Sequence, residues 1–129
     1  MITSSRILHL RKRLENGGLT KGQINTFEKK NIAKGLVSLT WDDLSSQIPK
    51  CNRFMYFNGS PKQISSLKLD HTVQGVFLAF TGIKNMNLNR LRRHVSTISE
   101  KINDEAFLTW SASASGKKPV VQAIFGYKR

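Results

Sequence analysis

The run G-V-F-L-A-F-T-G at residues 75–82 decides the architecture of this 129-residue chain. Its centre is almost entirely apolar, which is typical of a strand that is covered on both faces of a sheet. A helix is expected next, over 88–102, because apolar residues recur there at helical spacing. Two further strands are expected at 107–114 and 120–127, joined into a hairpin by a turn at 115–118. The order predicts an α+β domain with one mixed sheet of about four strands packed on helices.

The residues before this run predict shorter elements. The apolar run G-L-V-S-L at 35–39 favours a strand, and the T-W-D-D sequence after it favours a helix that begins near Thr40 and ends before Pro49. An aromatic-rich strand is expected at 53–57, closed by a turn at Asn58-Gly59. A short helix is possible at 61–68.

Two helices are expected at the N-terminus. The first covers 4–16, with Ser4 or Ser5 as its cap, and ends at Gly17-Gly18. The second begins at Thr20, where T-K-G-Q has the spacing of a capping box. The chain therefore divides into a basic helical N-terminal segment, 1–34, and an α+β domain, 35–129.

Large apolar side chains indicate which surfaces are buried. Trp110 alternates with smaller residues along its strand and is expected in the core, as is the aromatic cluster of the 53–57 strand. The helix over 88–102 should bury one continuous apolar face, which consists of Leu88, Leu91, Val95, Ile98 and Ile102.

The charge is the most unusual feature of the composition. Lys and Arg total 21 against 8 Asp and Glu, a formal net charge of +13. Residues 1–34 and 75–129 each carry +6, whereas 35–74 carry +1. Such a field attracts an anionic partner: nucleic acid, an acidic protein surface or anionic lipid. The alternative is a solvated basic surface that keeps the protein soluble.

Several classes of protein are disfavoured by what the sequence lacks. It has no apolar run of the roughly 20 residues that a membrane helix needs, and no secretory signal pattern. The single cysteine excludes an internal disulfide framework, so a cytoplasmic location is expected. No metal-ligand spacing, nucleophile motif or phosphate-binding loop G-x-x-x-x-G-K-S/T occurs. We therefore expect no enzyme activity, no cofactor, no metal and no small-molecule substrate.

Four short motifs resemble FtsZ, the bacterial relative of tubulin. Residues 35–44, G-L-V-S-L-T-W-D-D-L, resemble the FtsZ synergy loop G-L-I-N-x-D-F-A-D-V. Residues 75–82 resemble the strand G-V-L-x-N-I-T-G, and 106–110 resemble A-N-I-I-W/F. Residues 120–127 resemble the closing strand V-x-V-x-A-T-G-F. The order and spacing of these motifs imply a C-terminal domain of the FtsZ/tubulin superfamily over residues 35–129.

The departures from the family pattern bear on function. The 129 residues hold no counterpart of the nucleotide-binding domain, and the 1–34 segment breaks the family's central helix at Gly17-Gly18. In the loop, Ser38 replaces the family's Asn and Thr40 replaces its first Asp. Asp43 keeps the second Asp, which polarises the attacking water on a neighbouring subunit's GTP. The resemblance thus implies a non-catalytic domain that binds a tubulin- or FtsZ-type polymer subunit, or itself, and caps or modulates a cell-division type of cytoskeletal filament.

The resemblance assigns the partner contact to the loop. Trp41 stands where the family has Phe and is either exposed at the contact or buried, while Asp42 and Asp43 either cap a helix or face the partner. The implied partner-binding residues are Ser38, Thr40, Trp41, Asp42 and Asp43.

Two other interpretations stay open. The N-terminal helices could bind nucleic acid, because eight basic side chains fall within residues 6–34. Alternatively, Asp43 could complete another subunit's GTPase site. The candidate anion-binding residues are Arg6, Arg11, Lys12 and Arg13 in the N-terminal segment, and Arg90, Arg92 and Arg93 on the helix over 88–102.

Overall fold

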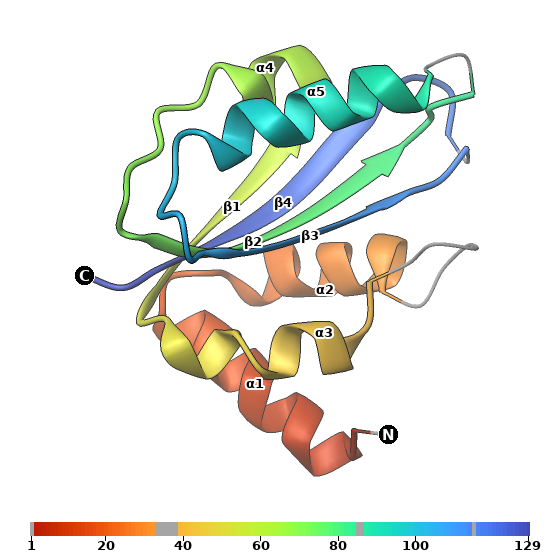
Figure 1. The fold of residues 1–129 in the computed structure, drawn as a ribbon. Coiled ribbons are helices and arrows are strands. Elements are labelled where there is room, and N and C mark those ends of the chain that lie inside the picture. The colour runs from red at the N-terminus through yellow and green to blue at the C-terminus, as the bar shows by residue number, and fades with distance from the viewer. Residues whose placement is uncertain (1, 33–38, 85–86, 115) are drawn as a thin grey trace.

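A four-stranded sheet lies between two layers of helices in the computed structural model, which describes residues 2–32, 39–84, 87–114 and 116–129 (Figure 1). Helices α4 and α5 cover one face of the sheet, and α1, α2 and α3 cover the other. No helix among the described residues is long and apolar enough to cross a membrane. The elements are α1 (Ser4–Asn16), α2 (Lys21–Asn31), α3 (Trp41–Ser45), the 3₁₀ turn η1 (Ile48–Lys50), β1 (Arg53–Gly59), α4 (Pro61–Ser65), β2 (Val73–Thr81), α5 (Leu88–Ser99), β3 (Phe107–Ala112) and β4 (Val120–Tyr127).

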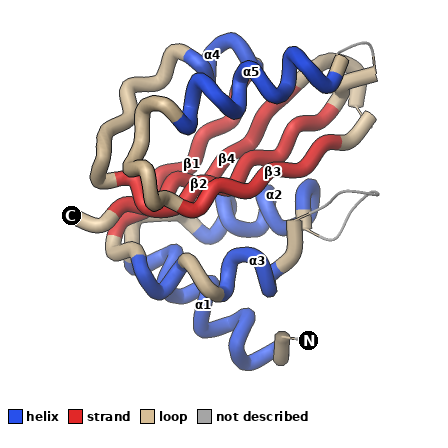
Figure 2. The backbone as a smooth tube through the Cα atoms, viewed as in Figure 1, coloured by secondary structure: helices blue, strands red, loops and turns tan. Residues whose placement is uncertain are grey.

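The strand order is β1-β4-β2-β3, so the sheet is mixed as predicted (Figure 2). Strand β2 pairs with β3 in parallel, whereas β4 pairs antiparallel with both β1 and β2. The predicted hairpin of the last two strands is wrong, because β2 separates β3 from β4. The α5 crossover places β3 along one side of β2, and β4 can then reach β2 only along the other side.

The uniform apolar run of β2 follows from its central place. Val76, Leu78 and Phe80 point into the core beneath α4 and α5, while Phe77 and Ala79 point into the core above α1 to α3. All five side chains are at most 1% exposed. The middle of β2 buries both faces, so residues 76–80 are all apolar and the alternation of a half-exposed strand is absent.

Helix α5 buries most of its predicted apolar face. Leu91 and Ile98 are buried, and Val95 packs partly buried beside them. The helix ends at Ser99, before the predicted limit of 102, and Ile102 is buried in the segment that follows it. Leu88, however, is 50% exposed, so its predicted burial is wrong. Side chains on a helix lean toward its N-terminus, and Leu88 is the first residue of α5. Its side chain therefore extends past the N-terminal end of α5 and is left half-exposed.

The two N-terminal helices form where the sequence indicates. Helix α1 spans the predicted residues, but its cap is Thr3, whose hydroxyl accepts from the backbone N–H of Arg6, and not Ser4 or Ser5. Helix α2 has the predicted capping box at Thr20.

Both N-terminal helices contribute to the core beneath the sheet. Leu10 and Leu14 of α1 and Ile24 and Phe27 of α2 belong to the same cluster as Phe77 of β2. The N-terminal segment 1–34 and the sheet therefore share one core. The predicted boundary between residues 34 and 35 lies outside the described residues.

Two local elements differ from expectation. Helix α3 ends at Ser45, before the expected limit, and a separate 3₁₀ turn with Pro49 near its start follows it. Strand β1 runs through Asn58 and Gly59 in place of a turn there, because both pair with β4. Of the strand expected at 35–39, only Leu39 is described.

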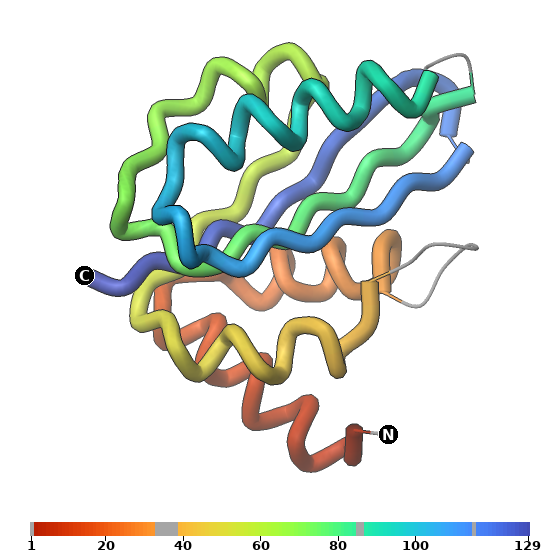
Figure 3. Tube along the Cα trace, in the orientation of Figure 1, coloured from red at the N-terminus to blue at the C-terminus, as the bar shows by residue number. Residues whose placement is uncertain are grey.

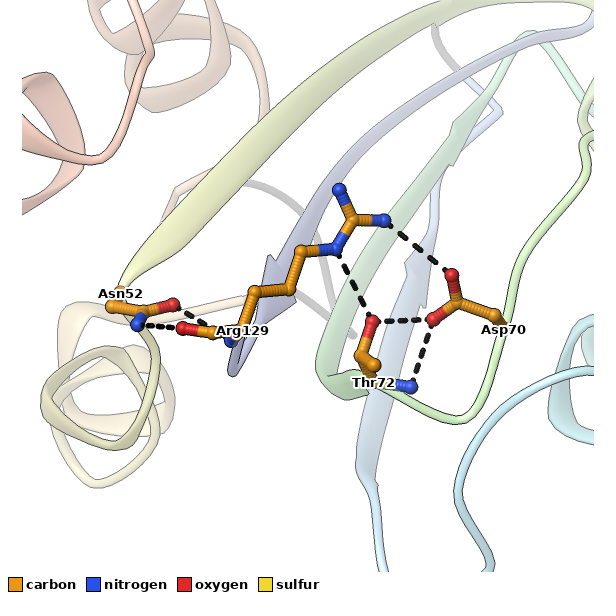
Figure 4. Close-up of polar contacts among 4 residues, drawn as sticks. All are labelled: Asn52, Asp70, Thr72 and Arg129. Carbon is orange, nitrogen blue, oxygen red and sulfur yellow. Dashed lines mark hydrogen bonds and ion pairs between the residues drawn. The ribbon is translucent and has the colours of Figure 1, made fainter.

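A polar network holds the C-terminal residue against the start of β1 (Figure 4). The backbone N–H of Arg129 donates to Asn52 Oδ1 at 3.0 Å, and Asn52 Nδ2 donates to the Arg129 carbonyl at 2.6 Å. The Arg129 guanidinium lies 3.4 Å from Asp70 and stacks over the Tyr127 ring. Hydrogen bonds from Thr72, with a smaller contribution from Arg129, lower the pKa of Asp70. The network extends the pairing of β4 with β1 beyond the last strand residue.

Two substitutions on α5 should differ sharply in cost. Ile98→Ala removes a fully buried side chain and leaves a cavity, so it should lower the free energy of unfolding by about 2–4 kcal/mol. Leu88→Ala, at a half-exposed position, should cost about 0.5 kcal/mol or less. Urea denaturation followed by far-UV circular dichroism measures both. Equal losses would contradict the described orientation of α5.

Candidate partner-binding face

The predicted partner-binding loop lies between the end of α2 and the start of α3. Ile32, the residue after α2, and Leu39, the residue before Thr40, form a parallel bridge and so lie side by side. Figure 3 shows that this point lies at the same end of the molecule as the end of β2 and the start of β4. Ser38 is outside the described residues. Thr40, Trp41, Asp42 and Asp43 follow the bridge directly.

Thr40 and Asp43 form a reciprocal cap at the start of α3. Asp43 Oδ2 accepts hydrogen bonds from the backbone N–H of Thr40 at 2.8 Å and from its hydroxyl at 3.0 Å. The Thr40 hydroxyl accepts in turn from the backbone N–H of Asp43. Asp43 therefore caps the helix and is half-buried, whereas Asp42 is exposed. Of this acidic pair, Asp42 is the side chain that a partner can reach most directly.

Trp41 was expected to be either exposed at the partner contact or buried, and the structure shows that it is buried. The residue is 7% exposed and belongs to the core beneath the sheet. Its indole N–H donates to Glu28 Oε2 at 2.7 Å, so the polar edge of the ring is satisfied inside the protein. The ring therefore holds α3 in place and offers little surface to a partner.

Glu28 joins three helices, and the sequence gives no sign of this role. One carboxylate oxygen accepts from Trp41 of α3, and the other accepts from Arg11 of α1 at 2.9 Å. Arg11 also contacts Asn25 of α2. Nothing in the spacing around Glu28 distinguishes it from an ordinary solvated helix residue, because its partners lie far away in the sequence. Its carboxylate fixes the position of α3, and hence of Asp42.

The predicted anion-binding residues do not form one surface. Helix α1 lies beneath the sheet and α5 above it (Figure 1), so the exposed Arg90, Arg92 and Arg93 are separated from the α1 cluster. Within that cluster, Arg11 is paired with Glu28, and Arg13 donates to the Pro49 carbonyl at 3.0 Å. The fold thus divides these seven residues between two faces and uses part of their charge internally.

Reactive side chains in the described part of the chain serve structural contacts. The Ser65 hydroxyl donates to the Pro61 carbonyl and lies 2.6 Å from His94 Nδ1, which therefore donates to it. Burial and the nearby Arg90 lower the pKa of His94. Burial raises the pKa of the Cys51 thiol. No three His, Cys, Asp or Glu side chains of the described residues gather closely enough to hold a metal ion.

Comparison with known proteins relates the fold to FtsZ and to TubZ filaments. No protein-family model matches the sequence, and no curated protein does. Among solved structures, an empty FtsZ dimer of M. jannaschii matches with a TM-score of 0.56 and 18% identity, over 73% of this chain and 32% of the other. GDP-form protofilaments of Bacillus thuringiensis serovar israelensis TubZ match with a TM-score of 0.58 and 15% identity, over 84% and 35%. The TubZ-Bt four-stranded filament matches with a TM-score of 0.58 and 13% identity, over 98% and 41%.

These matches show that the chain has an FtsZ/tubulin-like fold, as its motifs implied. The chain spans between about a third and two fifths of the length of the proteins that it matches. The likeness to the TubZ-Bt filament covers 98% of the chain and so includes α1 and α2. It therefore extends beyond residues 35–129, to which the sequence motifs were confined.

The two aspartates of α3 should differ in their effect on stability. Asp43→Ala removes one half of the cap and should lower the free energy of unfolding by about 0.5–2 kcal/mol. Asp42→Ala, at an exposed position, should change it by about 0.5 kcal/mol or less. Thermal unfolding of both variants measures the difference. Equal stability of the two would show that the cap does not contribute.

Proposed function

We propose that this chain is a non-catalytic FtsZ/tubulin-like domain that binds the subunits of a cytoskeletal GTPase polymer and caps or modulates the filament. The observation that carries the proposal is the fold shared with TubZ filaments and protofilaments over 84–98% of the chain. In those proteins the fold occurs within subunits that assemble. A chain with the same fold is suited to the same kind of contact, with a polymer subunit or with a second copy of itself.

The contact is assigned to the segment around α3. The resemblance of residues 35–44 to the synergy loop implies docking on the nucleotide face of the next subunit. Thr40 and Asp43 hold the start of α3 in a fixed geometry, and Glu28 anchors its Trp41. Asp42 is exposed at this start and is available to a partner.

The capping role rests on the chemistry that the sequence lacks. Its 129 residues contain no phosphate-binding loop motif. A molecule that binds through the α3 segment and offers no nucleotide site to the next subunit would stop growth at that end. The net charge of +13 would strengthen the attraction to an acidic filament.

Co-sedimentation with an FtsZ- or TubZ-type polymer tests the proposal. The purified chain should bind the polymer and lower its sedimented mass or change its GTP turnover. Asp42→Ala should weaken this effect about fivefold or more, because a contact residue is lost. Asp104→Ala is the matched control: it removes an equally exposed carboxylate from the loop after α5, at the other end of the molecule.

Three outcomes of this assay would count against the proposal. Polymer mass and GTP turnover that do not respond to a saturating concentration of the wild-type chain would overturn it. Equal effects of the Asp42 and Asp104 variants would remove the α3 segment from the contact. Tight binding to nucleic acid in a parallel assay, without polymer binding, would favour the nucleic-acid alternative.

The chain by itself should not hydrolyse GTP. Without a phosphate-binding loop, nothing in its 129 residues is expected to hold the triphosphate for attack. A phosphate-release assay on the purified chain should stay at the rate of the buffer blank. Turnover that rises with protein concentration and disappears in Asp43→Ala would contradict the non-catalytic assignment.

A further inference from the structure

Four lysines from two distant parts of the chain line one groove. Lys29 and Lys30 lie in the last turn of α2, and Lys117 and Lys118 lie in the turn before β4. The groove has a volume of about 520 Å³, and all four side chains are exposed. We call this feature the lysine groove.

The charge of the lysine groove is not balanced by its lining. Among the described residues, none that lines it is acidic. The helix dipole of α2 accounts for lysines in its last turn, because cations are favoured near a helix C-terminus. It does not account for Lys117 and Lys118, which lie outside any helix. Ammonium groups around one groove repel one another, and an anion between them would relieve that repulsion.

The two walls of the groove are held in fixed positions. At Gly82 the backbone φ is 70°, and a Cβ there would lie 1.9 Å from the Lys118 carbonyl oxygen, so the lysine turn packs directly on the end of β2. On the other side, Asn31 of α2 donates to Gln122 of β4 at 2.5 Å, and both residues are buried. The backbone segments that carry the lysines are thus held in place relative to each other before any ligand arrives, which lowers the entropy cost of binding.

We propose that the lysine groove binds an extended acidic segment of a partner polypeptide. Its cations are all lysines, which act as single point charges and lack the forked geometry with which arginine grips phosphate. In the part of the chain that the structure describes, no aromatic side chain lines it, so these residues offer nothing on which a nucleic-acid base could stack. Val120 and the methylene stems of the lysines provide apolar surface. The groove therefore fits a chain in which carboxylates alternate with apolar side chains.

This inference goes beyond the proposed function and can be tested without a polymer. The probe is a short fluorescein-labelled peptide in which Glu and Asp alternate with Leu and Val, measured by fluorescence anisotropy. Its control is the same peptide with Lys in place of every acidic residue. The wild-type chain should bind the acidic probe, with an affinity that falls as salt rises, and should not bind the basic one.

Charge reversal locates the site. The double variants Lys29→Glu/Lys30→Glu and Lys117→Glu/Lys118→Glu should each weaken binding of the acidic probe by about tenfold, because two attractive contacts become repulsive. Lys62→Glu/Lys68→Glu is the matched control. It makes the same change in net charge at exposed positions in and just after α4, which covers the other face of the sheet, and should leave the affinity within about twofold. Circular dichroism confirms that each variant is folded.

Several results would overturn the assignment. Loss of affinity in the Lys62→Glu/Lys68→Glu variant equal to that in the groove variants would show that net charge alone drives binding. Binding of single-stranded DNA more tightly than the peptide, lost in the groove variants, would reassign the groove to nucleic acid. Displacement of the peptide by inorganic phosphate at equimolar concentration would show that the lysine groove is a simple phosphate site. No binding of the acidic probe at low salt would refute the inference outright.

Discussion

The antiparallel pairing of β2 with β4 holds the molecule together. These are the two central strands of the sheet, and each is apolar on both faces, so each can be buried only if helices cover the sheet above and below. Phe77 lies opposite Ile124 in the lower core, and Leu78 lies opposite Ala123 in the upper one. The upper cover comes from α4 and α5, and the lower cover comes from α1 to α3. The N-terminal helices are therefore part of the architecture that the central pair requires.

The same pairing brings the functional candidates to one end of the molecule. Because β4 runs antiparallel to β2, the turn before β4 meets the end of β2, where Gly82 leaves no room for a side chain. The Asn31–Gln122 contact then places the end of α2 beside the start of β4. The α3 segment begins at that point, through the bridge of Ile32 with Leu39. A single strand pairing thus sets the lysine groove and the proposed polymer contact next to each other.

Charge is distributed by the fold in a way that the net value of +13 does not reveal. Part of it is balanced internally, because Arg11 forms an ion pair with Glu28. Part is spread over α5 on the opposite face. The concentration at the lysine groove arises from residues 29–30 and 117–118, which no motif in the sequence connects. A partner therefore meets local fields, each with its own geometry, and not one uniform basic surface.

The sequence by itself determined the helices and strands, the mixed sheet and the likeness to FtsZ, because these depend on local periodicity, capping residues and short apolar motifs. The capping box at Thr20, the helix start at Thr40 and the doubly buried 75–82 run are examples. Only the tertiary structure decided the insertion of β4 between β1 and β2, the burial of Trp41 and the bridging role of Glu28. Each of these depends on which distant residues meet in space. A pairing between strands, or between a carboxylate and an indole on different helices, leaves no trace in the spacing of either partner, and for that reason only the folded chain reveals it.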